Sequence, residues 1–220
     1  PARGRDLRRR ERAARMVGDD ADDIHRQLAD ALAIEQVAEA MVEDARLLRE
    51  LGAEICVVVA FGALLSQEVL NQGPRFVNVH FSLLPKFRGA APVQRTILSE
   101  ANQSGVSIFE IDAGLDTGPL LAQVAIELDG TETTPSLLHK LTEIAIPELM
   151  RVIDRDPTPA PQQGVASYAP KVSKMDGRIN STEGLGYAYT RFRALAIEPG
   201  VWFETSIGNL GVINAELVDA

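Results

Sequence analysis

Short apolar runs alternate with helical patterns along the chain, and this alternation limits the possible fold more than any other feature. Ile55–Ala60 is a fully apolar run rich in β-branched residues, as expected for a parallel strand that is covered on both faces. Residues 22–50 instead place apolar side chains at helical spacing and are followed by Gly52, which suits a C-cap. The pattern predicts an α/β fold with a Rossmann-like, open and mostly parallel sheet.

Shorter patterns predict the remaining elements. We expect further strands at 75–79, 106–111 and 120–128, and further helices at 66–70, 92–100, 135–153 and 181–195. Near the end, two strand-like runs, 201–205 and 210–217, flank a hairpin signal at 206–209. Because a lone hairpin is marginal in water, we expect it to begin a second, β-rich domain of OB-like type.

The predicted organisation has three parts and two cut ends. A main domain is expected over 1–180, a linker or helix over 181–199, and the start of the C-terminal β domain over 200–220. The chain begins at Pro1 in place of Met and stops at Ala220, just after a strand-like run. We therefore expect sequence to be missing at both ends.

Composition excludes several classes of protein. With 45% hydrophobic and 24% charged residues, the chain is neither disordered, collagen-like nor stapled by disulfides. No window approaches eighteen uncharged apolar residues, so we expect no spanning helix and no membrane partner. The single cysteine, Cys56, lies in an apolar run and cannot form an intrachain bridge. These features fit a cytoplasmic protein, which we expect to be a monomer.

Charge is distributed unevenly along a chain whose net charge is −9. Seven arginines lie among the first fifteen residues: Arg3, Arg5, Arg8, Arg9, Arg10, Arg12 and Arg15. Such a cluster attracts phosphates and could bind a nucleic acid. It could equally be a solvated arm whose charges pair with the acidic stretch that follows over residues 19–44.

Three polar residues follow predicted strands and are candidates for catalysis. In an open α/β sheet, ligands bind beyond the carboxyl ends of the strands. Asn78 and His80 are two residues apart at the end of one strand, so both side chains project from the same face. The predicted strand 106–111 ends just before the turn that carries Asp116. We expect these three side chains to meet in one crevice, without a metal, because zinc-ligand spacing is absent here.

Each candidate also has a purely structural interpretation. Asn78 could cap or turn the chain at the strand end, and Asp116 could close a turn before Thr-Gly. A lone histidine such as His80 is more often structural than catalytic. Ser82 lacks the Gly-x-Ser-x-Gly elbow of a nucleophile and is interpreted as a hydrogen-bonding loop residue. The case for chemistry therefore rests on the combination.

Two ordered motifs resemble a known family. The stretch 78–89, Asn-Val-His-Phe-Ser-Leu-Leu-Pro-Lys-Phe-Arg-Gly, and the stretch 112–118, Asp-Ala-Gly-Leu-Asp-Thr-Gly, resemble the formyltransferases that use 10-formyltetrahydrofolate. Within these, Arg88–Gln94 and Ser167–Lys171 resemble the methionyl-tRNA formyltransferases, whereas sugar-nucleotide formyltransferases usually depart from Arg-Gly-Ala-Ala-Pro. The resemblance is strong over residues 55–175 and implies a formyltransferase fold, a folate cosubstrate and initiator methionyl-tRNA as the partner.

The resemblance also implies roles for particular positions. The family's catalytic asparagine, histidine and aspartate fall on Asn78, His80 and Asp116. The folate-binding positions fall on Phe61, Gly62, Ala63, Leu64, Ser82, Leu83, Leu84, Pro85, Asp112, Ala113, Gly114 and Leu115. The candidates for tRNA contact are Arg3, Arg5, Arg8 and Arg88. The family's first strand, glycine turn and next helix would lie upstream of Pro1.

Formyl transfer is the attack of an amine on a formamide-like carbon, which generates an oxyanion. Freeing an α-amino group of pKa about 7.7–8 costs only about 1 kcal/mol at pH 7. Losing one oxyanion donor typically costs more, about 2.7–4 kcal/mol. We therefore expect Asn78 and His80 to donate to the oxyanion while Asp116 orients His80. The carboxylate should favour the imidazolium, so His80 is expected to be cationic near neutral pH.

Two other functions remain open from the sequence. The acceptor could be a sugar-nucleotide or another small amine, although Arg88–Gln94 argues against it. Alternatively, the chain could be an inactive remnant that retains the sheet core and some affinity for folate.

Overall fold

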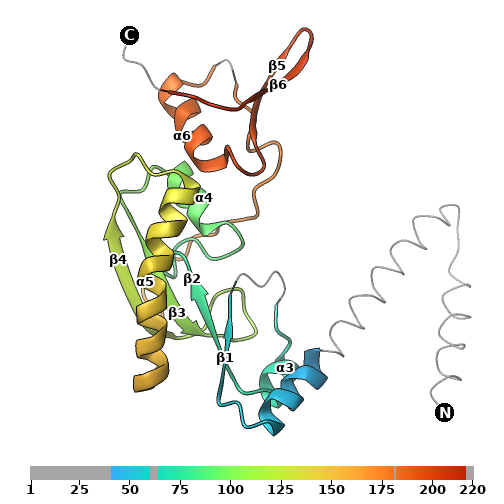
Figure 1. The fold of residues 1–220 in the computed structure, drawn as a ribbon, viewed down its shortest axis with the longest axis vertical. Helices are drawn as coiled ribbons and strands as arrows, with labels where there is room; N and C mark the ends of the chain where they lie inside the picture. Colours follow the sequence, from blue (N-terminus) through green and yellow to red (C-terminus); the bar gives the residue numbers. More distant parts are fainter. Residues whose placement is uncertain (1–40, 60–63, 181, 217–220) are drawn as a thin grey trace, which may run out of the picture.

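Four strands form the central sheet of the computed structural model, which describes residues 41–59, 64–180 and 182–216 (Figure 1). The sheet order is β1-β2-β3-β4, with β1 at Ile55–Val58, β2 at Arg75–His80, β3 at Gln103–Glu110 and β4 at Leu120–Glu127. β1 and β2 pair in parallel, whereas β2–β3 and β3–β4 pair antiparallel. The predicted α/β class is confirmed, and the sheet is mixed.

A small helical layer lies beside β1. Residues 41–50 are helical, and α3 follows β1 at Gln67–Gln72. Ser66 caps α3, because its side chain accepts a hydrogen bond of 3.3 Å from the backbone N–H of Val69. The layer encloses a small core formed by Ala45, Leu65, Val69 and Phe76. The exposed fraction of Val57 is 37%, so β1 is less covered than its apolar sequence predicts.

The longest helix, α5 at Thr134–Arg155, covers β3 and β4 (Figure 1). Its start is fixed by a capping box, in which Thr133 and Ser136 exchange side-chain and backbone hydrogen bonds. The buried face of α5 packs on the sheet to form the main core, which includes Leu137, Leu141, Val152, Val77, Val106 and Ile108. This core holds β2 and β3 in place, and the candidate site is built around the end of β2 and the loop that follows β3.

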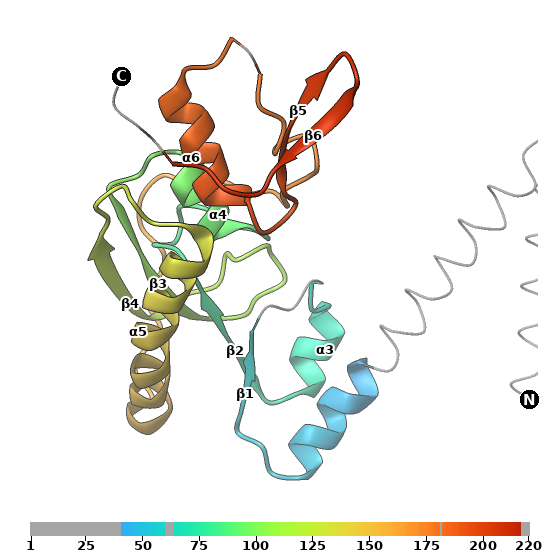
Figure 2. The same ribbon diagram turned by 45° about the horizontal axis from the view of Figure 1, so that its top comes forward.

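Two shorter helices and a hairpin lie together at one end of the sheet (Figure 2). α4 spans Pro92–Leu98 and α6 spans Leu185–Leu195. The hairpin consists of β5 at Val201–Thr205 and β6 at Gly208–Val212, and Val201 is buried in the main core. The expected hairpin is present, with a shorter second strand. Among the described helices, none is long and apolar enough to cross a membrane.

One aspartate ties the segment before α6 to α4. The Asp176 carboxylate accepts hydrogen bonds from the backbone N–H and hydroxyl of Ser173, at 2.8 and 2.7 Å. It also accepts a 2.9 Å bond from the Arg95 guanidinium. Burial acts to raise the pKa of Asp176, but these hydrogen bonds and the charge of Arg95 outweigh it and lower the pKa from 3.8 to about 2.

Asp176→Asn should therefore lower the free energy of unfolding at pH 7 by about 2 kcal/mol, because one pKa unit corresponds to about 1.4 kcal/mol. A pKa depressed by folding stabilises the protein above pH 3.8, and this contribution is lost as the pH falls toward 2. Urea unfolding at pH 7 and pH 3 should show the difference between variant and wild type shrinking at the lower pH. The exposed Asp154→Asn serves as control, and equal stability of both variants at pH 7 would contradict this assignment.

Candidate active site

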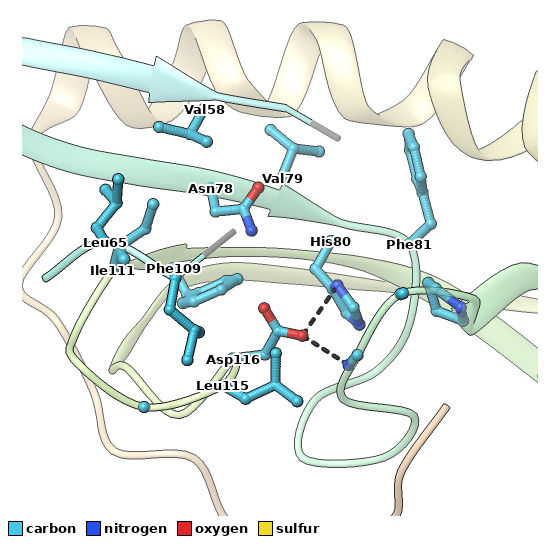
Figure 3. A pocket seen from close by; sticks show the side chains of 15 residues that line it. Val58, Leu65, Asn78, Val79, His80, Phe81, Phe109, Ile111, Leu115 and Asp116 are labelled. Atoms are coloured by element: carbon cyan, nitrogen blue, oxygen red, sulfur yellow. Dashed lines mark hydrogen bonds and ion pairs between the residues drawn. The ribbon is translucent and has the colours of Figure 1, made fainter. Parts of the chain in front are cut away.

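The end of β2 forms one wall of a cavity of about 360 Å³. Asn78 and His80 alternate with Val79 along the strand, so they face the cavity together, as predicted (Figure 3). The cavity is lined by Val58, Leu64, Leu65, Asn78, Val79, His80, Phe81, Gly89, Ala90, Pro92, Phe109, Ile111, Gly114, Leu115 and Asp116. Its size and its apolar lining with a few polar groups are typical of a small-molecule site.

Asp116 reaches the cavity by a route that the sequence did not reveal. β3 runs antiparallel to β2 and pairs Phe109 with Asn78, so the end of β3 does not lie beside the end of β2. The loop after β3 instead returns across the cavity and presents Asp116 at a left-handed φ of 51°, which aspartate tolerates. The Asp116 Oδ2 atom lies 3.8 Å from Nδ1 of His80 (Figure 3). The three predicted catalytic residues therefore meet at one cavity.

Two glycines let the loops approach each other closely. A Cβ on Gly118 would lie 1.7 Å from the Glu110 carbonyl oxygen, so a side chain there would displace the Asp116 loop. Gly89 has a φ of 119°, and its N–H donates a 2.7 Å hydrogen bond to Asp116 Oδ2. This bond fixes the carboxylate at the cavity.

The hydrogen bonds of His80 define which ring nitrogen faces the cavity. Nε2 lies 2.9 Å from the Phe87 carbonyl oxygen, which can only accept, so Nε2 carries a proton. Burial lowers the pKa of His80, and this effect outweighs the Asp116 charge and the Phe87 hydrogen bond, which raise it. The expectation of a cationic His80 near neutral pH was wrong, because the residue is only 6% exposed and burial disfavours the charged ring. A neutral ring protonated on Nε2 leaves Nδ1 free to accept a proton.

Asn78 offers a hydrogen-bond donor to the cavity. In Figure 3 its amide nitrogen points to the side on which His80 and Asp116 lie. Its Oδ1 atom is buried without a hydrogen-bond partner among the residues that the structure describes. The described contacts therefore leave the amide uncommitted, which suits a group that binds a ligand.

Comparison with known proteins decides the family. The sequence profile described as formyl transferase matches residues 8–153, which is well over half of the chain. The chain belongs to the formyl transferase family. A methionyl-tRNA formyltransferase of Thermus thermophilus is 44% identical over 159 residues, which cover 71% of this chain and 52% of that protein. The chain thus spans about half the length of the curated relatives it matches.

Solved structures of formyl transferases share the fold. The methionyl-tRNA formyltransferase from Clostridium thermocellum has a TM-score of 0.67 at 20% identity, covering 77% of this chain and 75% of that chain. HypX from Aquifex aeolicus, solved in complex with tetrahydrofolic acid, has a TM-score of 0.65 at 18% identity, covering 76% and 29%. At these identities the likeness shows the fold alone, and it confirms the predicted formyltransferase fold.

The predicted folate-binding residues of the first strand end and the Asp116 loop separate into three groups. Leu64, Gly114 and Leu115 line the cavity, whereas Phe61, Gly62 and Ala63 lie outside the described residues. Asp112 and Ala113 are not part of the lining. Asp112 instead shapes the loop, since its Oδ1 accepts hydrogen bonds from the Gly114 N–H at 3.0 Å and the Thr117 hydroxyl at 2.6 Å.

The predicted folate residues Ser82, Leu83, Leu84 and Pro85 lie outside the cavity lining. The Ser82 hydroxyl donates to the Lys86 carbonyl oxygen at 2.6 Å, which confirms its interpretation as a loop hydrogen-bonding residue. The buried Ser107 hydroxyl donates to the Ser82 carbonyl at 2.7 Å and accepts from the Leu84 N–H at 3.0 Å. These residues therefore shape the turn that follows His80.

Of the four arginines predicted to contact tRNA, the structure describes Arg88. Arg3, Arg5 and Arg8 lie outside the described residues. Arg88 lies beside Gly89, but its guanidinium is bonded to Gln162, at 2.6 and 3.3 Å. Sequence reasoning missed Gln162, because no motif marks it within a Pro-rich loop.

Sequence reasoning also missed part of the apolar cavity wall. Val58 of β1 and, at the end of β3, Phe109 and Ile111 line the cavity. The alternation of Phe109 and Ile111 at the end of β3 was the available signal. Among the described residues, no group of three or more His, Cys, Asp or Glu is placed to hold a metal ion.

Proposed function

We propose that this chain transfers a formyl group from 10-formyltetrahydrofolate to the α-amino group of initiator methionyl-tRNA. The observation that carries the proposal is the meeting of Asn78, His80 and Asp116 at one cavity. The methionyl-tRNA formyltransferase relatives, at 38–44% identity, support this choice of acceptor. A cytoplasmic monomer without a metal remains our expectation.

The cavity fits the folate part of such a reaction. Val58, Leu65 and Leu115 supply apolar surface for a flat ring, and the volume of about 360 Å³ lies in the range of small-molecule pockets. The amide oxygen of Asn78 is buried and has no hydrogen-bond partner among the described residues, so the Asn78 amide is free to bind a ligand. Bound folate would supply the formyl carbon that the amine attacks.

Asn78, His80 and Asp116 have separate roles in this transfer. The Asn78 amide donates a hydrogen bond to the formyl oxygen, which gains negative charge as the amine nitrogen bonds to the carbon. Nδ1 of His80 accepts the proton that the amine loses, and the Asp116 carboxylate stabilises the resulting imidazolium. The ring then returns this proton to the departing folate nitrogen as the carbon–nitrogen bond breaks. The products are the formylated amine and tetrahydrofolate.

The protonation state of His80 favours this order of events. A general base must be unprotonated at the working pH, and burial keeps the pKa of His80 below its ordinary value of 6.5. Because Nε2–H is engaged by the Phe87 carbonyl, His80 cannot use it to donate to the oxyanion. His80 is therefore a proton carrier in this proposal and not a donor to the oxyanion.

Transfer assays with two acceptors test the proposed function. The full chain is supplied with labelled 10-formyltetrahydrofolate and either initiator methionyl-tRNA or an amino-sugar nucleotide. We expect label on the methionyl-tRNA, with a KM for tRNA that rises at least about tenfold between about 50 and 200 mM salt as phosphate contacts weaken. Label only on the amino sugar, with a salt-independent KM, would reject tRNA as the acceptor. Folate binding without transfer to either acceptor would support the inactive alternative.

A further inference from the structure

Gln162 lies outside the cavity lining and yet contacts both loops that bring polar groups to it. Its Nε2 atom donates hydrogen bonds to the carbonyl oxygens of Asp116 and Gly118, at 2.9 and 2.8 Å. Its Oε1 atom accepts from Nη2 and Nε of Arg88, at 2.6 and 3.3 Å. Both donors and the acceptor of the amide are thus in use. One half-buried side chain therefore connects two segments that are 28 residues apart in the sequence.

A second bond joins the same two segments on the cavity side. The Gly89 N–H donates to the Asp116 carboxylate, while the neighbouring Arg88 is bonded to Gln162. Asp116 is thus held through its carboxylate by one loop and through its carbonyl by Gln162. Aspartate tolerates the left-handed φ of 51° at Asp116 but does not prefer it, so contacts from outside the loop are needed to hold the loop in one conformation. These contacts supply that constraint.

We propose that Gln162 is a positioning residue that fixes the Asp116 carboxylate at its place beside His80. The geometric part of this inference stands on hydrogen bonds alone, whereas its kinetic consequence rests on the proposed function. Gln162 is not a catalytic residue, because it does not line the cavity.

The amide of Gln162 is required by the groups that surround it. Two carbonyl oxygens need donors, and the Arg88 guanidinium needs an acceptor. Leucine has a similar volume but supplies neither, so Gln162→Leu keeps the packing and removes every hydrogen bond. Gln163 is exposed and lies next in the chain, so Gln163→Leu makes the same chemical change without touching the site.

Titration of the His80 ring tests the geometric part. NMR can follow His80 because the sequence contains three histidines, and the His80→Ala spectrum identifies its signal. Asp116 is the charged group that raises the pKa of His80 in the described structure. If Gln162→Leu releases the Asp116 loop, the pKa of His80 should shift by at least about 0.3 units from the wild-type value, downward where the Asp116 charge is lost and upward where the ring also gains water. Gln162→Ala provides a second variant, and Gln163→Leu should titrate like the wild type.

Kinetics then separate this inference from the proposed function. We expect Gln162→Leu to lower kcat for formyl transfer by about ten- to a hundredfold, with the KM for folate changed less than about threefold. A His80 pKa unchanged from the wild type in both folded Gln162 variants would overturn the positioning role. A shifted His80 pKa with unchanged kcat would uphold the positioning role and reject the catalytic part that we assign to Asp116.

Discussion

Replacement of His80 by alanine is expected to lower kcat for formyl transfer by about 10²- to 10⁴-fold, the range typical of a lost general base. Nδ1 of His80 faces the cavity and the Asp116 carboxylate, so the variant has no group at this place to take the proton of the amine. The KM for folate should change little, because the apolar wall remains.

Steady-state kinetics with saturating folate measure this effect, and His139→Ala is the matched control. His139 lies on the exposed face of α5, 76% exposed at its side chain, so its loss should leave kcat unchanged. A kcat for His80→Ala within about threefold of the wild-type value would reject His80 as the general base.

The pH dependence of His80 follows from its burial. The pKa of the ring is lowered from 6.5, so in the folded chain it should titrate below pH 6.5. Because the unfolded chain binds this proton more readily, the contribution of the neutral ring to stability is full above pH 6.5 and is lost as the pH falls through the interval below. NMR titration of the wild type would contradict this assignment if His80 titrated above pH 6.5.

Asn78→Ala should lower kcat by about 10²- to 10³-fold, because it removes a hydrogen-bond donor from the oxygen that becomes charged. The effect should appear mainly in kcat, since the donor is most valuable when the negative charge develops. The Asn78 amide oxygen makes no hydrogen bond among the described residues, so the substitution breaks no such contact of Oδ1. Catalysis should therefore fall far more than stability does.

The measurement is a comparison of Asn78→Ala with Asn78→Asp. Aspartate has almost the same shape but places a carboxylate against the developing negative charge, so its kcat should be at least as low as that of alanine. Thermal unfolding of both variants checks that the fold is kept. Equal kcat values for wild type and the folded Asn78→Asp would remove Asn78 from the mechanism.

The sequence predicted the elements of the fold well where one local pattern decided the outcome. β5 at Val201–Thr205 matches its predicted range, and α5 extends the predicted 135–153 by one or two residues at each end. The pairing of Asn78 and His80 on one face of β2 follows from the strand repeat alone. Such features depend on neighbours in the sequence, and a single sequence contains that information.

Features that depend on tertiary contacts could not be predicted in the same way. The route of the Asp116 loop depends on the antiparallel pairing of β2 and β3. No residue in either strand indicates the direction of that pairing. The protonation of His80 depends on burial by several segments, and its effect is larger than that of the one charge visible in the motif. The position of Gln162 depends on a Pro-rich loop returning to the site.

A double-mutant cycle between His80 and Asp116 tests most directly whether the site acts as one unit. Asp116→Asn removes the charge but keeps an oxygen that can accept from the Gly89 N–H. If Asp116 acts through His80, Asp116→Asn should lower kcat strongly in the wild type but by less than about threefold in the His80→Ala background. Losses that simply multiply would show that the two residues act independently, and would contradict the account.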